Sequence, residues 1–237
     1  MPLQLSIIIP TLNEATTIVE TLQPLQALRT WGHEIIVVDG GSSDDTLQVA
    51  RPFADKLLQA ARGRARQMNA GAAVAQGNVL VFLHADTILP ESSDRAITTA
   101  LRNRKRVWGR FDVRLSGSQP LFRVIACAMN LRSCLTGIAT GDQAIFVRRR
   151  VFAQIGGFAD IPLMEDIILS RALRRVSRPA RIKKRVLTSS RRWEQQGIIR
   201  TIVKMWLLRL RFFLGADPTR LAQRYEAQSH QSRVTAG

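Results

Sequence analysis

Three short runs of mainly aliphatic residues, each followed by polar residues, dominate the N-terminal part of the chain. They cover residues 6–9, 34–38 and 79–83, and they lead to Glu14, Asp39 and Asp86. Uninterrupted aliphatic runs of this length are typical of strands that are buried on both faces of a parallel sheet. Ligands of open α/β sheets bind beyond the carboxyl ends of such strands, so these three carboxylates should converge on one crevice. Carboxylates repel one another unless a cation or sugar hydroxyl groups lie between them, and the pattern therefore predicts a ligand site.

Helical patterns alternate with these strands. The predicted strands are 4–10, 34–39, 56–59, 78–83, 107–115 and 144–148, and the predicted helices are 14–28, one starting near 43, 64–75, 90–103, 119–135, 149–155, 166–175 and 198–214. Strands that alternate with helices indicate βαβ units. We therefore predict an α/β fold with a mostly parallel central sheet flanked by helices.

The length and the cysteine content place the chain among ordinary globular proteins. Its 237 residues suffice for one large domain, or for one domain with a C-terminal appendage. Cys127 and Cys134 lie seven residues apart in a predicted helix, too far apart to form a disulfide, and we interpret both as packing residues of a reducing compartment. The first strand begins almost at Met1, without a signal peptide, so we expect a cytoplasmic protein.

The charge is strongly positive and unevenly distributed. The net charge is +17, and residues 171–220 hold fifteen Lys or Arg against two acidic residues. Such an excess attracts polyanions such as nucleic acid or anionic lipid, unless it is simply a solvated basic face. No RRM, KH or helix-turn-helix signature is present, so we expect no nucleic acid and favour an anionic membrane surface.

The predicted helix at 198–214 combines basic and apolar residues. Its four cations and seventeen residues make it a poor membrane-spanning segment. A basic helix with Trp and Phe on its apolar side fits a position in the membrane interface, and packing against the rest of the protein is the alternative. We therefore expect a peripheral protein at the inner face of the membrane.

Several short motifs together carry a resemblance to a known family. They are Ile8–Glu14 (IIPTLNE), Val38–Asp44 (VDGGSSD), Asn69–Gly71 (NAG), His84–Asp86 (HAD), Gly141–Gln143 (GDQ) and Glu165–Asp166 (ED). In this order and spacing, the chain resembles a family 2 glycosyltransferase with the GT-A fold, from about residue 4 to residue 225. It is similar to the short bacterial selenodomain-associated or arsenosugar-type transferases. The resemblance implies a GT-A catalytic domain at 1–190, and we expect a basic helical segment at 191–225 and a polar tail at 226–237.

The resemblance also implies a nucleotide-diphospho-sugar donor, which we expect to be UDP-linked. The residues implied to bind it are Pro10, Thr11, Asn13, Glu14, Asp39, Gly41, Arg66, Asn69, His84, Ala85 and Asp86. Some of these residues have alternative roles. Asp39 could cap the following helix, Glu14 could be an ordinary acid of a first helical turn, and Arg62 or Arg64 could replace Arg66 at the diphosphate.

The His84-Ala85-Asp86 segment occupies the position of the family's Asp-x-Asp metal motif. In an extended segment residues i and i+2 point the same way, so His84 and Asp86 should face one ligand. A divalent cation, Mn²⁺ or Mg²⁺, that bridges two phosphates takes few oxygen ligands from the protein, and Asp86 is the expected ligand. His84 stands in place of the first acid, where it could bind Mn²⁺ or hydrogen-bond the sugar.

The Glu165-Asp166 pair precedes an amphipathic helix, where either acid could simply cap that helix. The resemblance implies that Asp166 is the general base of an inverting transfer and that Glu165 is its neighbour. The acceptor pocket would contain Gly141, Asp142, Gln143, Arg192 and Trp193. Ser189 stands where processive relatives have Gln, so a polymer-extruding synthase is disfavoured.

The sequence thus predicts a metal-dependent, inverting glycosyltransferase that acts on a lipid-linked or amphipathic acceptor. A polyprenyl-phosphate sugar transferase would share every donor residue. A nucleotide-sugar-binding protein without turnover and a basic adaptor are further alternatives. A dinucleotide-dependent dehydrogenase is disfavoured because no Gly-x-Gly-x-x-Gly follows the first strand.

Overall fold

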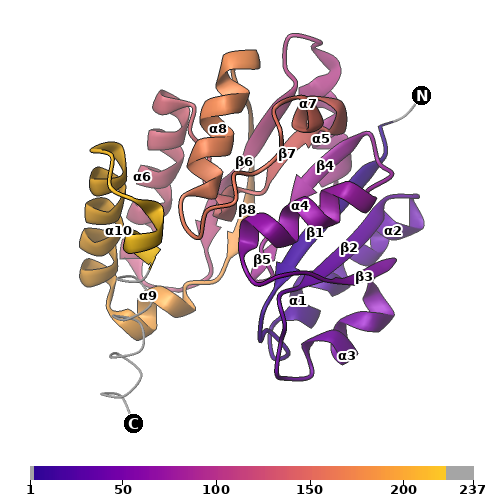
Figure 1. Cartoon of the computed structure of the whole chain (residues 1–237), viewed down its shortest axis with the longest axis horizontal. Helices are drawn as coiled ribbons and strands as arrows, with labels where there is room; N and C mark the ends of the chain where they lie inside the picture. The colour runs from indigo at the N-terminus through magenta and orange to yellow at the C-terminus, as the bar shows by residue number, and fades with distance from the viewer. Residues whose placement is uncertain (1–2, 223–237) are drawn as a thin grey trace.

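An eight-stranded sheet forms the centre of the molecule in this computed structural model (Figure 1). The structure describes residues 3–222, with the side chains of Arg192 and Gln196 excepted. In spatial order the strands are β3 (Lys56–Gln59), β2 (Glu34–Asp39), β1 (Leu5–Thr11), β4 (Val79–Phe82), β7 (Ile145–Arg148), β6 (Trp108–Leu115), β8 (Ala180–Thr188) and β5 (Thr87–Ile88). The first four strands are parallel to one another, while β7 runs antiparallel to both β4 and β6. The carboxyl ends of β1, β2 and β4 therefore meet at one edge.

Helices cover both faces of this sheet. Their bounds are α1 (Ile18–Leu22), α2 (Gln26–Thr30), α3 (Thr46–Ala50), α4 (Arg64–Val74), α5 (Ser93–Arg102), α6 (Pro120–Thr136), α7 (Arg149–Gln154), α8 (Glu165–Val176), α9 (Arg191–Gln196) and α10 (Ile198–Phe213). Alternate residues of each strand point to opposite faces. Ile7 and Ile9 of β1 accordingly pack in the hydrophobic core shared with α1 and α5, whereas Ile8 packs in the core shared with α4, α7 and α8.

Most of the predicted elements are confirmed, and the largest difference has a clear cause. The predicted helix 14–28 begins only at Ile18 and is interrupted by a 3-10 turn at Gln23–Leu25, where Pro24 cannot donate a helical hydrogen bond. The helix expected from Ser43 begins at Thr46, and the helix expected from Pro90 begins at Ser93. The short strand β5, the strand β8 and the helix α9 were not predicted.

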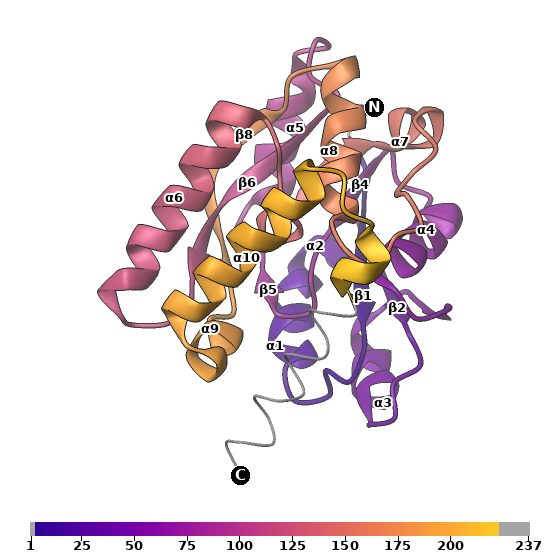
Figure 2. The ribbon, with the colours of Figure 1, turned by 60° about the vertical axis from the view of Figure 1, so that its left-hand side comes forward.

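The C-terminal helices α9 and α10 pack on the outside of the sheet beside α6 (Figure 2). Ile198 and Ile202 of this segment contact the core residues Phe122 and Ile125 of α6. Further along α10, Leu208 is buried in a cluster with Ile138, Met164 and Ile167, the last of which belongs to α8. Packing of this helix against the rest of the protein is thus observed, while its opposite side remains exposed. None of the helices within residues 3–222 is long and apolar enough to cross a bilayer.

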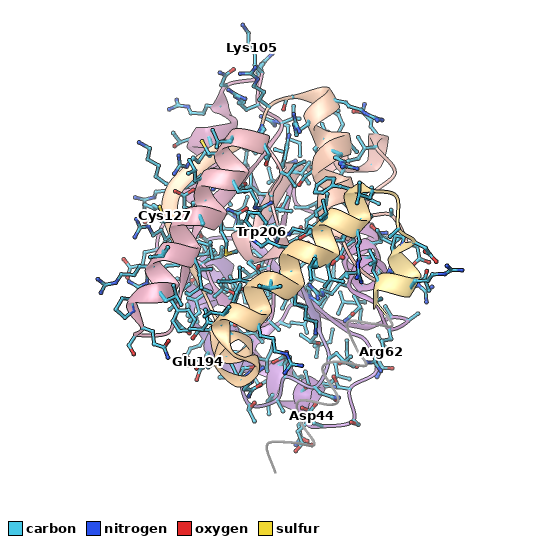
Figure 3. The ribbon with its side chains drawn as sticks, turned by 90° about the vertical axis from the view of Figure 1, so that its left-hand side faces the viewer. Asp44, Arg62, Lys105, Cys127, Glu194 and Trp206 are labelled. Atoms are coloured by element: carbon cyan, nitrogen blue, oxygen red, sulfur yellow. The ribbon has the colours of Figure 1, made fainter. Side chains whose placement is uncertain are left out.

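The interpretation of the two cysteines as packing residues is wrong. Cys127 and Cys134 are both exposed on α6. The core-facing positions of that helix are taken by Phe122, Ile125 and Ala126, and the cysteines lie on the other side of the helix. The exposed face that carries Cys127 also presents Trp206 of α10 (Figure 3).

Candidate active site

A cavity of about 420 Å³ opens at the carboxyl edge of β1 and β4, as the strand pattern predicted. Its walls come from the loops after β1 and β4, from α4 and from the C-terminal helices. The lining residues are Pro10, Thr11, Leu12, Glu14, Arg62, Gly63, Arg64, Gln67, His84, Ala85, Asp86, Leu115, Met129, Asp142, Pro162, Leu163, Thr188, Ser189, Trp193, Thr201, Met205 and Ala222. The cavity therefore contains Glu14 and Asp86, two of the three carboxylates that were expected to converge.

The third carboxylate, that of Asp39, does not line the cavity. Asp39 is fully buried, and its Oδ2 atom accepts hydrogen bonds from the backbone N–H groups of Gly41 and Ser42, each at 2.9 Å. The Ser42 hydroxyl donates to Oδ1 of the same carboxylate. Asp39 thus fixes the turn after β2. It does not cap the following helix, α3, whose N-cap residue is Asp45, so the alternative role that the sequence left open for Asp39 is wrong.

Asn13 and Gly41 belong to the same pair of loops. Asn13 adopts a left-handed backbone conformation with φ 54°, and its Oδ1 atom accepts a hydrogen bond from the Ser43 N–H at 2.8 Å. Gly41 has φ +91°, and a side chain there would meet no atom within 4 Å, so the space above it is open. Neither residue lines the cavity. Together they join the loop after β1 to the loop after β2.

Glu14 lies at the cavity wall and is held by two partners. Its Oε2 atom accepts a hydrogen bond from the Thr17 hydroxyl at 2.6 Å and lies 3.3 Å from Nη2 of Arg191. Arg191 belongs to α9, far from Glu14 in sequence. This contact ties the C-terminal segment to the first loop of the cavity.

The arginines near the start of α4 divide between the cavity and the surface. Arg62 and Arg64 line the cavity, whereas Arg66 is half exposed and pairs with Asp160 through Nε and Oδ1 at 2.8 Å. The structure therefore brings the two competing arginines to the cavity instead of Arg66. A helix starting at Arg64 turns residues 64 and 67 to one side and residue 66 away from it, because successive residues differ by about 100°.

Gln67 is a cavity residue that the sequence did not single out. It is buried, and its Nε2 atom donates to the backbone carbonyls of Thr11 and Val38, both at 2.8 Å. Asn69, which was predicted to bind the donor, hydrogen-bonds instead to the backbone N–H and C=O of Phe158. The sequence signal for Gln67 was its spacing, because a residue three positions after Arg64 lies on the same side of a helix as Arg64.

His84 packs tightly against Gly141. A Cβ atom built on Gly141 would overlap the Nε2 and Cε1 atoms of the imidazole, so only glycine fits at this position without movement of the ring. The Nδ1 atom of His84 lies 3.5 Å from Oδ1 of Asp142, which also lines the cavity. Ala85 and Asp86 complete the wall, and the Thr21 hydroxyl donates to the backbone carbonyl of Ala85 at 2.7 Å. The three residues of the His84–Asp86 segment thus face one cavity.

A divalent cation would fit this cavity only if a bound diphosphate supplied some of its ligands. Among the residues that the structure describes, no three His, Cys, Asp or Glu side chains form a group that could hold a metal ion. Asp86 presents a single carboxylate at the wall, and phosphate oxygens of a bound nucleotide would have to complete the coordination. The residues present suit a cation that binds together with a diphosphate.

Glu165 and Asp166 begin α8 close to this wall. Asp166 accepts hydrogen bonds from the backbone N–H of Ile167 at Oδ1 (2.7 Å) and from that of Gly141 at Oδ2 (3.0 Å). It does not line the cavity itself, but it is bonded to the neighbour of the lining residue Asp142. Burial, together with the nearby Asp166, raises the pKa of Glu165, and Arg64 opposes this shift with Nη1 3.8 Å from Oε1.

The remaining residues predicted for the acceptor pocket do not lie together. Gln143 is buried in the capping box of the 3-10 turn Gly141–Gln143, where its Oε1 atom accepts from the Thr140 N–H at 3.3 Å. Trp193 lines the cavity and packs against Leu115. Arg192 was also predicted here, but its side chain lies outside the described part of the structure.

The comparison with protein families decides the assignment of this chain. The sequence profile described as Glycosyl transferase family 2 matches residues 6–156, which is more than half of the chain. The chain belongs to glycosyltransferase family 2. The resemblance that the motifs carried is confirmed.

Curated relatives of this family 2 chain include glycosyltransferases from mycobacteria and staphylococci. It is 34% identical over 164 residues to the PGL/p-HBAD biosynthesis glycosyltransferase of Mycobacterium bovis (strain BCG / Pasteur 1173P2), covering 65% of this chain and 62% of that relative. It is 33% identical over 87 residues to the poly-beta-1,6-N-acetyl-D-glucosamine synthase of Staphylococcus aureus (strain COL), covering 34% of this chain and 21% of that relative. The chain thus spans less than two thirds of the length of these relatives.

Solved structures confirm the GT-A fold of this family 2 chain. S. aureus TarS 1–349 in complex with UDP-GlcNAc superposes with a TM-score of 0.65 at 16% identity, covering 78% of this chain and 58% of that chain. The mannosyltransferase PcManGT from Pyrobaculum calidifontis, in complex with GDP-Man and Mn²⁺, gives a TM-score of 0.61 at 18% identity, covering 94% of this chain and 69% of that chain.

Proposed function

We propose that this family 2 protein is an inverting glycosyltransferase that moves a sugar from a nucleotide-diphospho-sugar to an amphipathic acceptor at a membrane surface. The observation that carries the proposal is the cavity at the carboxyl edge of β1 and β4. Its lining includes Asp86, Arg62 and Arg64. Carboxylates suit a cation and sugar hydroxyls, while arginines suit phosphates. Both are needed to bind a donor of this class.

The nucleoside part of the donor would lie against the loop after β1, and its diphosphate against the start of α4. Pro10 and Thr11 line the first region, and Arg62 and Arg64 line the second. The structural neighbours with UDP-GlcNAc and with GDP-Man and Mn²⁺ support a nucleotide-sugar donor. We propose a UDP-linked sugar.

Asp86 would hold the divalent cation together with the diphosphate oxygens. When bound, Mn²⁺ or Mg²⁺ neutralises the negative charge that builds up on the departing diphosphate. Asp86 lies in a segment that is fixed at its start by the packing of His84 against Gly141. The backbone carbonyl of Asp86 also accepts a hydrogen bond from the Ser189 N–H at 3.1 Å, which ties the segment to the end of β8.

Asp166 would take the proton of the acceptor hydroxyl while its oxygen attacks the anomeric carbon of the sugar and the diphosphate leaves on the opposite side. Each oxygen of its carboxylate accepts one backbone hydrogen bond, and each retains a lone pair for the proton. The neighbouring Glu165, whose pKa is raised, would limit the negative charge next to the base. Trp193 would flank the acceptor.

The acceptor is proposed to be lipid-linked or amphipathic because two neighbouring helices expose apolar stripes. On α6 the stripe consists of Leu121, Val124, Leu131 and Leu135, and on α10 it consists of Ile199, Val203, Trp206, Leu207, Leu210, Phe213 and Leu214, all of which are exposed. Successive members of each stripe lie one, three, four or seven residues apart, spacings that keep them on one side of a helix. Figures 1 and 2 show the two helices side by side at the surface.

Basic residues accompany these stripes. Arg200 and Arg211 are exposed on α10, and Arg123 is exposed on α6. Apolar stripes flanked by cations are the arrangement with which interfacial helices bind anionic membranes. We propose peripheral attachment at the inner face of the membrane through α6 and α10.

A transfer assay tests this proposal. The purified protein would be incubated with Mn²⁺, with UDP-, GDP- or dTDP-linked sugars, and with lipid extract in vesicles, and glycosylated products would be detected by mass spectrometry. We expect one donor to yield a glycolipid of inverted anomeric configuration. A product with retained configuration, or transfer to water-soluble acceptors alone, would contradict the proposal.

A further inference from the structure

Two arginines on the neighbouring helices α6 and α10 have buried donor atoms without a hydrogen-bond partner among the described residues. They are Arg132 on α6 and Arg209 on α10. The Nε and Nη2 atoms of Arg132 and the Nε atom of Arg209 are buried, and they donate no hydrogen bond to any residue in the described part of the chain. Buried N–H groups are nearly always paired, since an unpaired one loses its hydration without compensation. These donors are therefore candidates to bind a ligand.

The two guanidinium groups also repel each other. Burial, followed by the charge of Arg209, lowers the pKa of Arg132 to about 10. Adjacent buried cations destabilise a fold unless an anion lies beside them. Asp142 and Asp166 are close enough to favour the charged form of Arg132, but neither accepts a hydrogen bond from the three buried donor atoms.

The arginine pair lies beside the acceptor end of the cavity. Arg132 follows the lining residue Met129 by three positions, and Arg209 follows the lining residue Met205 by four, so both lie about one helical turn beyond the wall. Asp166, the proposed base, is one of the groups whose charge acts on Arg132. The end of the cavity proposed for the nucleoside is formed by the loop after β1 and lies at a different wall.

The chemistry of the pair favours phosphate. A guanidinium presents a planar fork of N–H donors that matches two oxygens of one phosphate, and two guanidinium groups suit a doubly charged phosphomonoester. The exposed apolar stripes lie on the same two helices, α6 and α10. A ligand with a phosphate between the helices and a hydrocarbon chain along their exposed faces satisfies both features.

We propose that Arg132 and Arg209 form a subsite for the phosphate group of a phosphorylated lipid acceptor. This inference rests on the proposed function, because it takes the side of Asp166 as the acceptor side. It narrows the acceptor from any amphipathic molecule to a lipid that carries a terminal phosphate.

The test measures binding of farnesyl phosphate to the full-length protein by calorimetry, with UDP and Mn²⁺ present to occupy the donor site. Arg132→Gln or Arg209→Gln should weaken binding by about tenfold or more, because a charge-assisted hydrogen bond is lost. Arg104→Gln and Arg175→Gln remove the same charge from exposed positions outside α6 and α10 and should leave the affinity within about twofold of wild type. Farnesol, which lacks the phosphate, should not compete.

Several results would overturn the subsite. Equal binding of farnesol and farnesyl phosphate, or equal loss in all four variants, would show that the pair does not recognise phosphate. Much weaker binding of farnesyl phosphate in the presence of UDP than in its absence would assign the arginines to the donor diphosphate. Equal affinity for a short-chain phosphatidylglycerol, which carries a phosphodiester, would assign them to the membrane itself.

Two further readouts keep the result interpretable. Unchanged UDP affinity shows that a variant is folded, and if Arg132→Gln does not fold, then Arg132→Lys, which keeps the charge but loses the fork, should weaken farnesyl phosphate in the same way. If farnesyl phosphate binds in an arginine-dependent manner while UDP does not bind, the subsite stands and the proposed donor class falls.

Discussion

The imidazole of His84 packs against the α-carbon of Gly141, with no room for a side chain between them. This contact joins the loop after β4 to the 3-10 turn Gly141–Gln143. Asp86 lies on the first segment, and the second donates a backbone N–H to Asp166. The two carboxylates that the proposed reaction needs are therefore positioned through one glycine–histidine contact.

Gly141→Ala should destabilise the protein by about 1–3 kcal/mol, because the added methyl group overpacks the contact. The same change should impair transfer, since His84 must move and Asp86 lies in the same loop. His84→Ala in this background removes the clash and should recover most of the lost free energy of unfolding, measured by urea denaturation. Additive effects of the two substitutions would show that the contact does not position these segments.

Glu165→Gln should change how stability depends on pH. The pKa of Glu165 is raised above its ordinary value of 4.5, chiefly by burial. The folded state therefore holds this proton more tightly than the unfolded state, and the stability that the group contributes is present at low pH and is lost as pH rises through the raised pKa. The free energy of unfolding of Glu165→Gln minus that of wild type should become more positive from about pH 4 upward.

Arg64→Gln provides the matching control, since Arg64 lowers the pKa of Glu165. Without Arg64 the pKa of Glu165 rises further, so the stability loss should start at the same pH but be larger and continue to higher pH. A pH-independent difference between Glu165→Gln and wild type would contradict the assignment of a buried carboxyl with a raised pKa. Thermal unfolding across a pH series measures both.

Asp166→Asn keeps the shape of the side chain but removes its ability to take a proton. Transfer should fall by about 10²–10⁴-fold while UDP affinity stays near that of wild type. Asp142→Asn is the comparison, because Asp142 lines the same cavity and its neighbour Gly141 bonds to Asp166. If Asp142→Asn abolished transfer while Asp166→Asn retained more than about a tenth of it, Asp142 would be the better candidate for the base.

The sequence predicted β1, β2 and β4 closely because these strands are buried along their whole length. Strands β2 and β3 have the predicted bounds, and β1 and β4 differ by a residue or so. Such strands are continuous aliphatic runs that need no knowledge of their neighbours. The carboxyl edge, and with it the cavity at Asp86, followed from the same pattern.

Strand β8 could not be recognised because its pattern is broken by a register shift. Phe111 pairs with Ile182 while the next residue, Asp112, pairs with Arg185, so Lys183 and Lys184 are extra residues on β8. The buried Ile182 and Val186 are thus separated by three exposed basic residues, which no longer alternate as in a regular strand. The run of charges was interpreted only as a basic surface.

Which of the predicted site residues reach the cavity depends on helix phase and on loop contacts. Arg64 and Gln67 share the cavity side of α4, and Arg66 does not, which depends on where the helix meets the sheet. Asp39 has the residue type of a ribose ligand, yet its carboxylate holds a turn. Such roles depend on backbone N–H groups nearby, which a sequence pattern does not reveal.

Trp206→Ser should weaken binding to anionic vesicles by about tenfold, because burial of an aromatic side chain in the interface contributes about 2 kcal/mol. Trp206 is 72% exposed on α10. Trp31→Ser is a matched control, since Trp31 is 56% exposed at the end of α2, on another part of the surface. Vesicle flotation measures both, and an equal effect of the two substitutions would argue against attachment through α10.

The most direct test of the account is calorimetric titration of the full-length protein with UDP, GDP and dTDP, with and without Mn²⁺. We expect at least one nucleotide to bind with a Kd of about 1 μM–1 mM in the presence of Mn²⁺. Asp86→Asn or EDTA should weaken that binding about tenfold or more, while Mn²⁺ alone should bind poorly because Asp86 offers one carboxylate. Failure of every nucleotide to bind the folded protein with Mn²⁺ present would contradict the assignment of the cavity as a donor site.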